Sequence, residues 1–167
     1  MKTVNYNNWK QLLKDLKLEW LCKNHNAFFE LSGGYRMKIK PYSDRTANGL
    51  TNCIEDFVKH IGGYSNRINT TGTMRKINGC MTWTKGNSNK GAADVRILFN
   101  GKSIDVEVKI GRDILSAAQY REWLRIEQAG GLYCVAKDFP SFLEWWLDHF
   151  PLSILSLSKN GKLCQER

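Results

Sequence analysis

Two acidic side chains and one lysine in the middle of the chain have the types and the spacing that metal-assisted phosphoryl chemistry uses. Asp94 begins one strand-like run, Glu107 lies in the next, and Asn100-Gly101 separates the two runs. Because Asn-Gly favours a two-residue turn, the runs are expected to form a β-hairpin in which Asp94 faces Glu107. Lys109 then projects from the same face. Carboxylates are preferred ligands of Mg²⁺ and Mn²⁺, so the three residues predict phosphodiester hydrolysis rather than glycoside cleavage or acyl transfer.

The register of this hairpin follows from its short turn. Phe99 is expected to pair with Lys102, and the pairing continues outward one residue at a time. One face of the hairpin pairs Arg96 with Asp105 as an ion pair and also carries Asp94, Glu107 and Lys109. The remaining face is uniformly apolar and is expected to be the core side: Val95, Ile97, Ile104, Val106, Val108 and Ile110.

Two acids that face each other in this way need a compensating charge. Counted from the turn, Asp94 and Glu107 form a non-hydrogen-bonded pair, whose Cα atoms lie about 4.5 Å apart. Like charges at this position repel and cost stability. A proton on one carboxyl, a basic neighbour or a divalent cation could offset the repulsion. With a cation, Lys109 could orient the attacking water or stabilise charge on the phosphate. The alternative interpretation is that all three are solvated residues on an exposed sheet face.

The segments around the hairpin predict an α/β fold. Apolar residues recur at helical spacing over 8–24, 48–61 and 113–129, and Ile114 is among the apolar residues of the third range. A last helix is expected from a cap at Asp138 or Ser141 to Phe150. Residues 70–91 predict a long loop that could hold a short strand at 80–83. The expected strands are 35–40, 64–69, 94–99, 102–110 and 132–136.

The middle of the chain resembles a known nuclease family. Gly91-Ala92-Ala93-Asp94, followed by Ile104-Asp105-Val106-Glu107-Val108-Lys109, resembles the split D…ExK motif of PD-(D/E)xK nucleases. The stretches 116–119 and 128–136 resemble the VRR-NUC branch, in which a helix bearing a glutamine precedes an AGG-strand segment. The resemblance covers about residues 46–146. It implies a restriction-endonuclease-like core, with a mixed central β-sheet flanked by helices in the order αβββαβ, and leaves an N-terminal helical extension outside it.

The resemblance assigns roles residue by residue. Asp94 and Glu107 match the metal-binding acids, and the backbone carbonyl of Val108 would be a third ligand of Mg²⁺ or Mn²⁺. Lys109 matches the catalytic lysine, and Gln119 matches the glutamine of the following helix.

The chain departs from the family pattern at two positions. Ala93 stands where a proline usually precedes the first acid, and Asn48 stands where the first helix often carries an acid. Glu55 lies further along the same helical side as Asn48. It could replace the missing acid as a metal ligand, or it could be a solvated helix residue. Without a first-helix acid, a second metal ion is not expected.

Basic residues gather in the segment that leads to Asp94, and they predict contacts with the phosphates of DNA. Trp83, in the same segment, is expected to pack into the core, and stacking on an unpaired base is the alternative. The alternative for the segment is a solvated connector. No motif that reads base sequence is recognisable. The expected DNA-contacting residues are Arg75, Lys76, Lys85, Lys90 and Arg112.

The composition agrees with a nucleic-acid partner. The net charge is +9 and the pI about 9.4, which suits a polyanion, and nucleic acid is favoured over an anionic membrane. The sequence has no apolar run of transmembrane length and no signal-peptide pattern, so a cytoplasmic protein of a bacterial or phage-infected cell is expected, and not a secreted one. The five cysteines form no CxxC pair and are expected to be reduced thiols.

Taken together, the sequence predicts a Mg²⁺- or Mn²⁺-dependent DNA endonuclease. Cleavage is expected to be structure-selective, on branched DNA such as junctions, or only weakly selective, and the partner is duplex or branched DNA. A role in DNA repair or recombination and a homodimer are also expected as possibilities. The expected division is an accessory segment at 1–45, a nuclease domain at 46–150 and a tail at 151–167. Two alternatives remain open: a catalytically silent nucleic-acid-binding module, and an accessory subunit of a replication or recombination complex.

Overall fold

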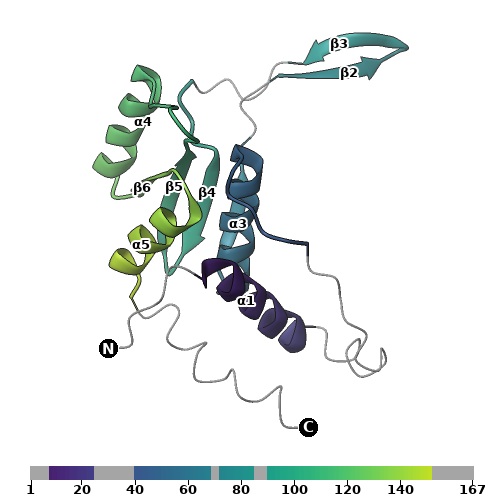
Figure 1. The fold of residues 1–167 in the computed structure, drawn as a ribbon. Helices are drawn as coiled ribbons and strands as arrows, with labels where there is room; N and C mark the ends of the chain where they lie inside the picture. The colour runs from purple at the N-terminus through teal and green to yellow at the C-terminus, as the bar shows by residue number, and fades with distance from the viewer. Residues whose placement is uncertain (1–7, 25–39, 69–71, 85–89, 152–167) are drawn as a thin grey trace, which may run out of the picture.

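A four-stranded mixed β-sheet organises the protein (Figure 1). The computed structural model describes residues 8–24, 40–68, 72–84 and 90–151. β1 pairs with β4 and β4 with β5 in antiparallel orientation, whereas β5 and β6 run parallel. The expected α/β fold, with a mixed sheet flanked by helices, is confirmed. The strands lie in the order β1 (Tyr64–Arg67), β4 (Val95–Phe99), β5 (Lys102–Val108) and β6 (Leu132–Ala136).

The central hairpin of β4 and β5 has the register predicted from its turn. Phe99 pairs with Lys102, and the pairing continues to Val95 and Val106. Asn100 and Gly101 have φ values of 48° and 74°, the left-handed conformations that a type I′ turn requires. The apolar face is buried as expected at Val95, Ile97, Ile104, Val106 and Val108.

Helices on the apolar face of the sheet enclose the hydrophobic core. α3 (Ala47–His60) and α5 (Phe139–His149) pack against the strands, and α1 (Trp9–Asn24) packs against α3. The ring of Phe57 makes edge-on contacts with the rings of three residues of α5, with centroids 5.5–5.9 Å apart: Phe139, Phe142 and Trp146. Residues of α1 belong to the same core cluster, so this part of the expected accessory segment shares its core with the rest.

Polar caps define where two of these helices begin. The hydroxyl of Thr46 accepts a hydrogen bond from the Gly49 N–H at the start of α3. The Asp138 carboxylate accepts one from the Ser141 N–H, so Asp138 is the cap of α5. Such a cap stabilises a helix because it satisfies an N–H that has no partner within the helix.

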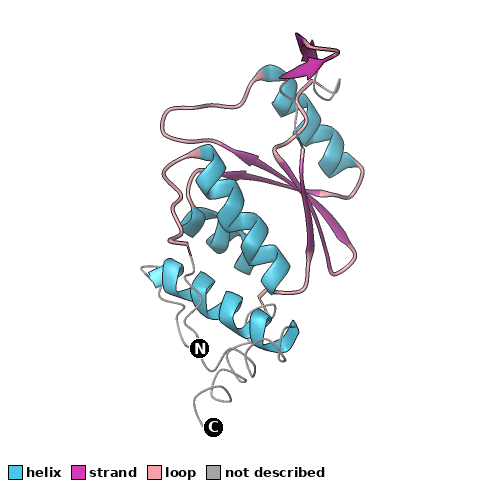
Figure 2. Cartoon of the chain, turned by 90° about the vertical axis from the view of Figure 1, so that its right-hand side faces the viewer, coloured by secondary structure: helices cyan, strands magenta, loops and turns pink. Residues whose placement is uncertain are grey.

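The fourth helix, α4 (Ala117–Gln128), covers the other face of the sheet at β6, and helices therefore lie on both sides of the sheet (Figure 2). The rings of Trp123 and Tyr133 stack with centroids 5.4 Å apart. The expected helix at 113–129 began too early. Ser116 caps the helix, so residues 113–115 lie before it in irregular structure, and Ile114 is 80% exposed rather than packed.

A second hairpin stands apart from the main sheet. β2 (Thr73–Ile77) and β3 (Cys80–Thr84) pair with each other in a separate two-stranded sheet. The short strand allowed at 80–83 is present as β3, whereas the loop expected elsewhere over 70–91 was wrong for the residues of β2. Their turn is Asn78-Gly79, with φ values of 50° and 86°. Trp83 on β3 is 62% exposed, so its expected packing in the core was also wrong.

Several sequence-based predictions lie outside the described residues. These are most of the strand at 35–40, nearly all of the tail at 151–167, and the phosphate contact of Lys85. Within the described ranges, no helix combines the length and apolarity needed to cross a membrane.

Candidate active site

The carboxylate of Glu107 is the buried centre of the candidate site. Glu107 lies on the central strand β5 and is 2% exposed. Its Oε1 accepts a hydrogen bond from the Gln119 side chain of α4 and lies 3.0 Å from Nζ of Lys109. Its Oε2 is buried and has no hydrogen-bond partner within the described part of the chain. One half of this carboxylate is therefore compensated and the other half is not.

The sheet face that carries the acids is covered rather than solvated at β5. Glu107 and Asp105 are each 2% exposed, and Lys109 is 7% exposed, so the interpretation of an exposed, solvated face is wrong here. Asp105 forms the expected ion pair with Arg96, through two hydrogen bonds of 2.8 Å. Of these two buried acids on one strand, Glu107 alone keeps an unpaired carboxylate oxygen.

Asp94 lies beside Glu107, immediately before β4. Its Oδ2 accepts a hydrogen bond of 2.9 Å from the Val108 N–H, and its carbonyl accepts one of 2.7 Å from the Ile68 N–H. The carboxylate of Asp94 thus accepts the N–H of Val108 at the end of β5, one residue before β4 begins. The peptide between Glu107 and Val108 links the two acids, which is consistent with their predicted juxtaposition.

The environment of Glu107 disfavours its charged form. Burial, and then the nearby charge of Asp94, raise the pKa of Glu107 to about 7, although Lys109 opposes the shift. Near neutral pH the carboxyl therefore exchanges between a protonated and an ionised form. Of the compensations expected from sequence, a proton on one acid and a basic neighbour are both used.

Lys109 acts at this site as a fixed positive charge. Its Nζ lies 3.0 Å from Glu107 and 3.4 Å from Oδ2 of Asp113. Burial lowers the pKa of Lys109, but the hydrogen bond and charge of Glu107, together with Asp113, outweigh burial and raise it. The amine therefore stays protonated at neutral pH, and it suits stabilisation of an anion better than removal of a proton.

Gln119 joins the start of α4 to the buried acid. Its side-chain Oε1 accepts a hydrogen bond of 2.9 Å from the Ser116 backbone N–H, and the backbone N–H of Gln119 donates to the Ser116 hydroxyl. This reciprocal capping box occupies the amide oxygen. The amide nitrogen is then directed at Glu107. The helix cap thereby fixes which atom of Gln119 faces the carboxylate.

Gly91 allows the segment before Asp94 to lie against the start of α4. Its φ is +89°, and a Cβ at this position would lie 2.5 Å from the Ala118 carbonyl oxygen and 2.9 Å from the Gln119 nitrogen. A larger residue would have to push the helix backbone away. The glycine of the Gly-Ala-Ala-Asp segment therefore sets the distance between the two acids and Gln119.

The donor set fits a hard divalent cation. A buried carboxylate oxygen with no partner costs free energy, and a cation would remove that cost. Within the described residues, no three His, Cys, Asp or Glu side chains form one metal cluster, so the side chains on offer are the two acids. Mg²⁺ is commonly held by one or two carboxylates, with waters and substrate phosphates completing its shell. The Val108 carbonyl is the further ligand predicted from sequence.

Glu55 is not grouped with the acid pair. It lines a pocket with Lys17, Tyr42 and Asp56, between α1 and α3. Burial raises the pKa of Glu55, and the charge of Arg67 opposes the shift. The structure therefore gives no support to Glu55 as a ligand beside Glu107.

Asn48, at the first-helix position of the family pattern, accepts a hydrogen bond from Arg67. Arg67 is the cross-strand partner of Val95, the residue after Asp94. The start of α3 therefore lies at the same end of the sheet as the acid pair, but it presents an amide there and not a carboxylate.

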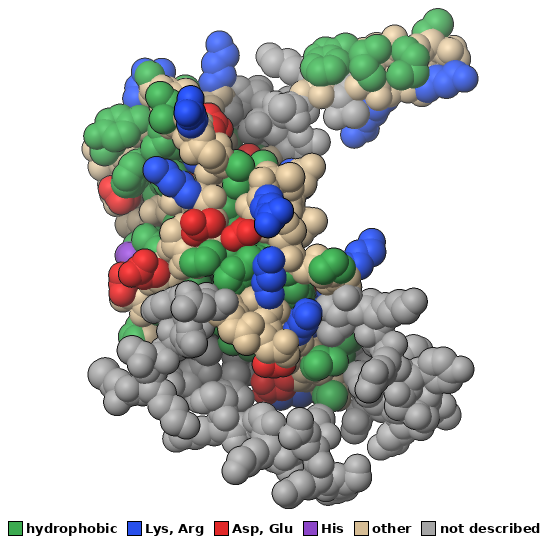
Figure 3. All heavy atoms as spheres, viewed as in Figure 1, with side chains coloured by type: hydrophobic (Ala, Val, Ile, Leu, Met, Phe, Trp, Pro, Cys, Tyr) green, Lys and Arg blue, Asp and Glu red, His purple; other side chains and the backbone are tan. Residues whose placement is uncertain are grey.

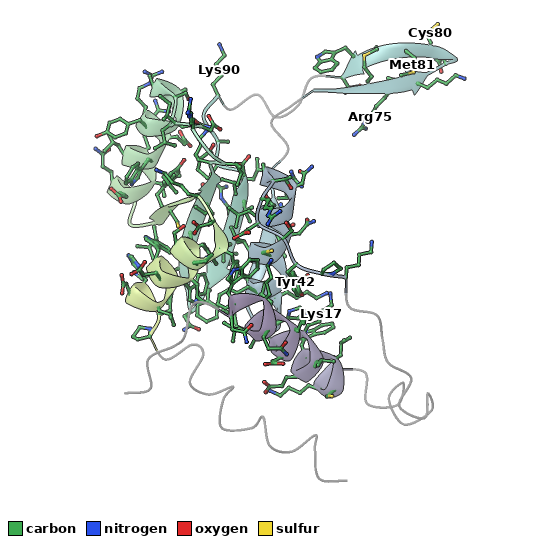
Figure 4. All side chains as sticks on the ribbon, in the orientation of Figure 1. Lys17, Tyr42, Arg75, Cys80, Met81 and Lys90 are labelled. Carbon is green, nitrogen blue, oxygen red and sulfur yellow. The ribbon has the colours of Figure 1, made fainter. Side chains whose placement is uncertain are left out.

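The predicted phosphate-binding residues are spread over two places. Arg75 and Lys76 lie on the β2–β3 hairpin and are exposed. Lys90 and Arg112 are exposed on the segments that flank the hairpin of β4 and β5. Figure 4 shows Arg75 and Lys90 projecting from the hairpin and from the segment that leads on to β4.

Sequence reasoning missed three residues that shape the site. Ser116 stands three residues before Gln119, and this S-x-x-Q spacing is the signature of a capping box. Asp113 stands four residues after Lys109, but that spacing is so common that it carried no signal. Gly91 was recognised as part of the motif, but its close approach to the start of α4 was not predicted.

Comparison of the chain with models of protein families, with curated proteins and with solved structures found no match. The chemistry of the site is therefore argued from its own geometry.

We expect Gly91→Ala to impair the site far more than Gly101→Ala. Both glycines have positive φ, so alanine costs about 1–2 kcal/mol of backbone strain at either position. Nothing lies within 4 Å of a Cβ at Gly101, whereas a Cβ at Gly91 meets α4. Gly91→Ala should therefore lose further stability and displace Gln119, which urea unfolding and the NMR signals of the Gln119 amide would show. Equal effects of the two substitutions would contradict this role of Gly91.

The raised pKa of Glu107 predicts how stability depends on pH without divalent cations. Between pH 4.5 and about 7, the folded protein holds a proton that the unfolded chain has released. Stability should therefore fall as the pH rises through this window and level off above it, by about 2–3 kcal/mol. Urea unfolding in EDTA at pH 5 and pH 8 measures the change. Glu107→Gln should lack this component, and an unaltered pH dependence in that variant would contradict the shift.

Proposed function

We propose that the protein is a metal-dependent nuclease that hydrolyses phosphodiester bonds in DNA. The observation that carries the proposal is the carboxylate of Glu107, which is buried beside Asp94 with one oxygen unpaired. Burial of an acid that is only half compensated destabilises the fold, so the arrangement is better explained by a ligand than by packing. A divalent cation satisfies this site, and phosphodiesters are the substrates whose charge such a cation can neutralise.

Each residue of the site has a definable part in this reaction. Asp94 and Glu107 would hold the cation, which would polarise the phosphate and lower the pKa of a water molecule. Lys109 supplies a fixed positive charge for the anionic transition state. Gln119 holds the Glu107 carboxylate in one orientation, so that Oε2 stays free for a ligand. Gln119 is therefore a positioning residue, and Lys109 is the expected catalytic residue.

The order of elements supports a restriction-endonuclease-like core of the VRR-NUC type. Without the inserted β2–β3 hairpin, the succession α3, β1, β4, β5, α4, β6 reads αβββαβ, the order that the sequence resemblance implies. Asp94 precedes the second strand of this series, Glu107 and Lys109 lie at the end of the third, and Gln119 lies on the helix that follows. The resemblance and the pairing of buried Glu107 with Asp94 therefore point to the same activity.

The first experiment is cleavage of duplex, single-stranded, flap and four-way-junction DNA in Mg²⁺, Mn²⁺ or EDTA. We expect metal-dependent cutting, reduced about a hundredfold or more by Glu107→Gln and by Lys109→Ala. Lys109→Ala should retain DNA binding, since its target is the reaction step.

Asp105→Asn is the matched control for Glu107→Gln. Both residues are acids on β5 that are 2% exposed, but both oxygens of Asp105 are already paired with Arg96. Asp105→Asn should lower stability and leave the metal requirement and cutting intact. No cutting by the wild type or by any variant, with salt-sensitive DNA binding by all, would indicate a silent binding module instead.

A further inference from the structure

The β2–β3 hairpin exposes an apolar face that the rest of the described chain does not cover. Met74 and Trp83 are cross-strand partners, and Lys76 pairs with Met81. Because side chains alternate along a strand, these four residues share one face of the hairpin. Met81 and Trp83 are each 62% exposed. Figure 3 shows hydrophobic side chains along the hairpin, with basic ones at its outer end and lower edge.

Such a face is costly unless it has a binding role. An isolated two-stranded hairpin is marginally stable in water, and exposed aromatic and methionine side chains add no burial to offset this. A partner that covers the hairpin would supply that burial.

The ring of Trp83 lies close to the backbone of Gly72 and is otherwise largely exposed. Gly72, at the base of β2, lies directly against the indole. A Cβ on Gly72 would lie 2.4 Å from the Cε2 and Cζ2 atoms of Trp83 and 2.7 Å from Nε1. The glycine thus makes room for the ring beside the backbone. The exposed part of the indole is thereby left open to stack on a flat ligand.

The charge around the hairpin identifies the kind of partner. Between Asp56 and Asp94 the sequence contains no acidic residue, whereas it contains six basic ones. Arg75 and Lys76 lie on the hairpin itself and are exposed. A flat aromatic surface beside uncompensated positive charge is the combination that binds single-stranded nucleic acid, in which phosphates meet the cations and bases stack on the ring.

We propose that the β2–β3 hairpin is an arm that binds unpaired nucleotides by stacking a base on Trp83. The substrate class is then DNA with a single-stranded segment, such as an overhang, a flap or an open junction, rather than uninterrupted duplex. This deepens the proposed nuclease function and rests on it for the reaction, but the binding step can be measured alone. The segment after β3 leads to Asp94, so the arm and the acid pair belong to one stretch of chain.

A second copy of this chain is a poorer fit to the arm. Two arms that paired through this face would bury Lys76 of each copy in the interface. No acid in the arm or its flanking segments would neutralise that charge. Nucleic acid supplies the missing negative charge.

The test is binding in EDTA at low salt, with the full chain carrying Glu107→Gln so that cleavage plays no part. The probes are fluorescent oligothymidylate and a blunt duplex. Trp83→Ala should weaken oligothymidylate binding about 5- to 150-fold, the range for loss of one base–aromatic stack, with little effect on the duplex. Trp83→Phe should retain most of the affinity.

Two further variants complete the design. Tyr64→Ala is the matched control, because Tyr64 is an aromatic residue of the main sheet that is 61% exposed; this variant should bind like its parent. Gly72→Ala keeps the indole but removes the space beside it, and should weaken oligothymidylate binding. The proposal would be overturned if Trp83→Ala bound oligothymidylate as tightly as its parent does. A concentration-dependent dimer, in sedimentation, that Trp83→Ala abolishes would also overturn it. In the separate cleavage experiment, a wild-type chain that does not cut DNA would contradict the nuclease proposal and leave the proposal for the arm unaffected.

Discussion

The arrangement of this protein around β5 depends on one carboxylate, that of Glu107, which is buried although its charge is only partly compensated. Glu107 sits on the central strand beneath α4, where water cannot reach it. Its neighbours each supply part of the compensation: Lys109 a positive charge, Gln119 a hydrogen bond, and solvent protons the rest at acidic pH. What remains is one buried carboxylate oxygen, Oε2, that has no hydrogen-bond partner within the described part of the chain. The capping box of α4 and the close approach of Gly91 serve this geometry, because they decide where Gln119 lies.

The local parts of this architecture could be predicted from the sequence. The register of β4 and β5 follows from Asn100-Gly101 and from alternation on both strands, and neither depends on distant residues. The burial of the acid face could not be predicted in the same way. It depends on α4, which lies between β5 and β6 in the chain. Because β6 runs parallel to β5, the chain between these strands must cross over one face of the sheet, and α4 packs on that face. A pattern within one hairpin carries no information about that crossing.

A strand at the position of β3 was allowed from the sequence, but β2 and its pairing with β3 were missed, although their turn, Asn78-Gly79, is the same dipeptide that identified the central hairpin. Its strands alternate weakly because neither face is buried, and periodicity detects strands mainly through burial. The same reason explains why Trp83 was expected in the core. A tryptophan that is 62% exposed is unusual. Together with the acid-free segment around it, this exposure connects the arm to the chemistry of the acid pair: one site would hold the phosphate and the other an unpaired base.

The central claim, that Glu107 and Asp94 form a divalent-cation site, is tested most directly by calorimetric titration of Mn²⁺ in buffers of different ionisation enthalpy. A carboxyl with a pKa of about 7 must lose its proton when the ion binds. Binding should therefore release about one proton per ion at pH 6 and almost none above pH 8, and it should be about tenfold tighter at pH 8 than at pH 6. Glu107→Gln should abolish the proton release, and Asp105→Asn should preserve it. Proton release that persists in Glu107→Gln, or Mn²⁺ binding that does not depend on Glu107, would contradict the account.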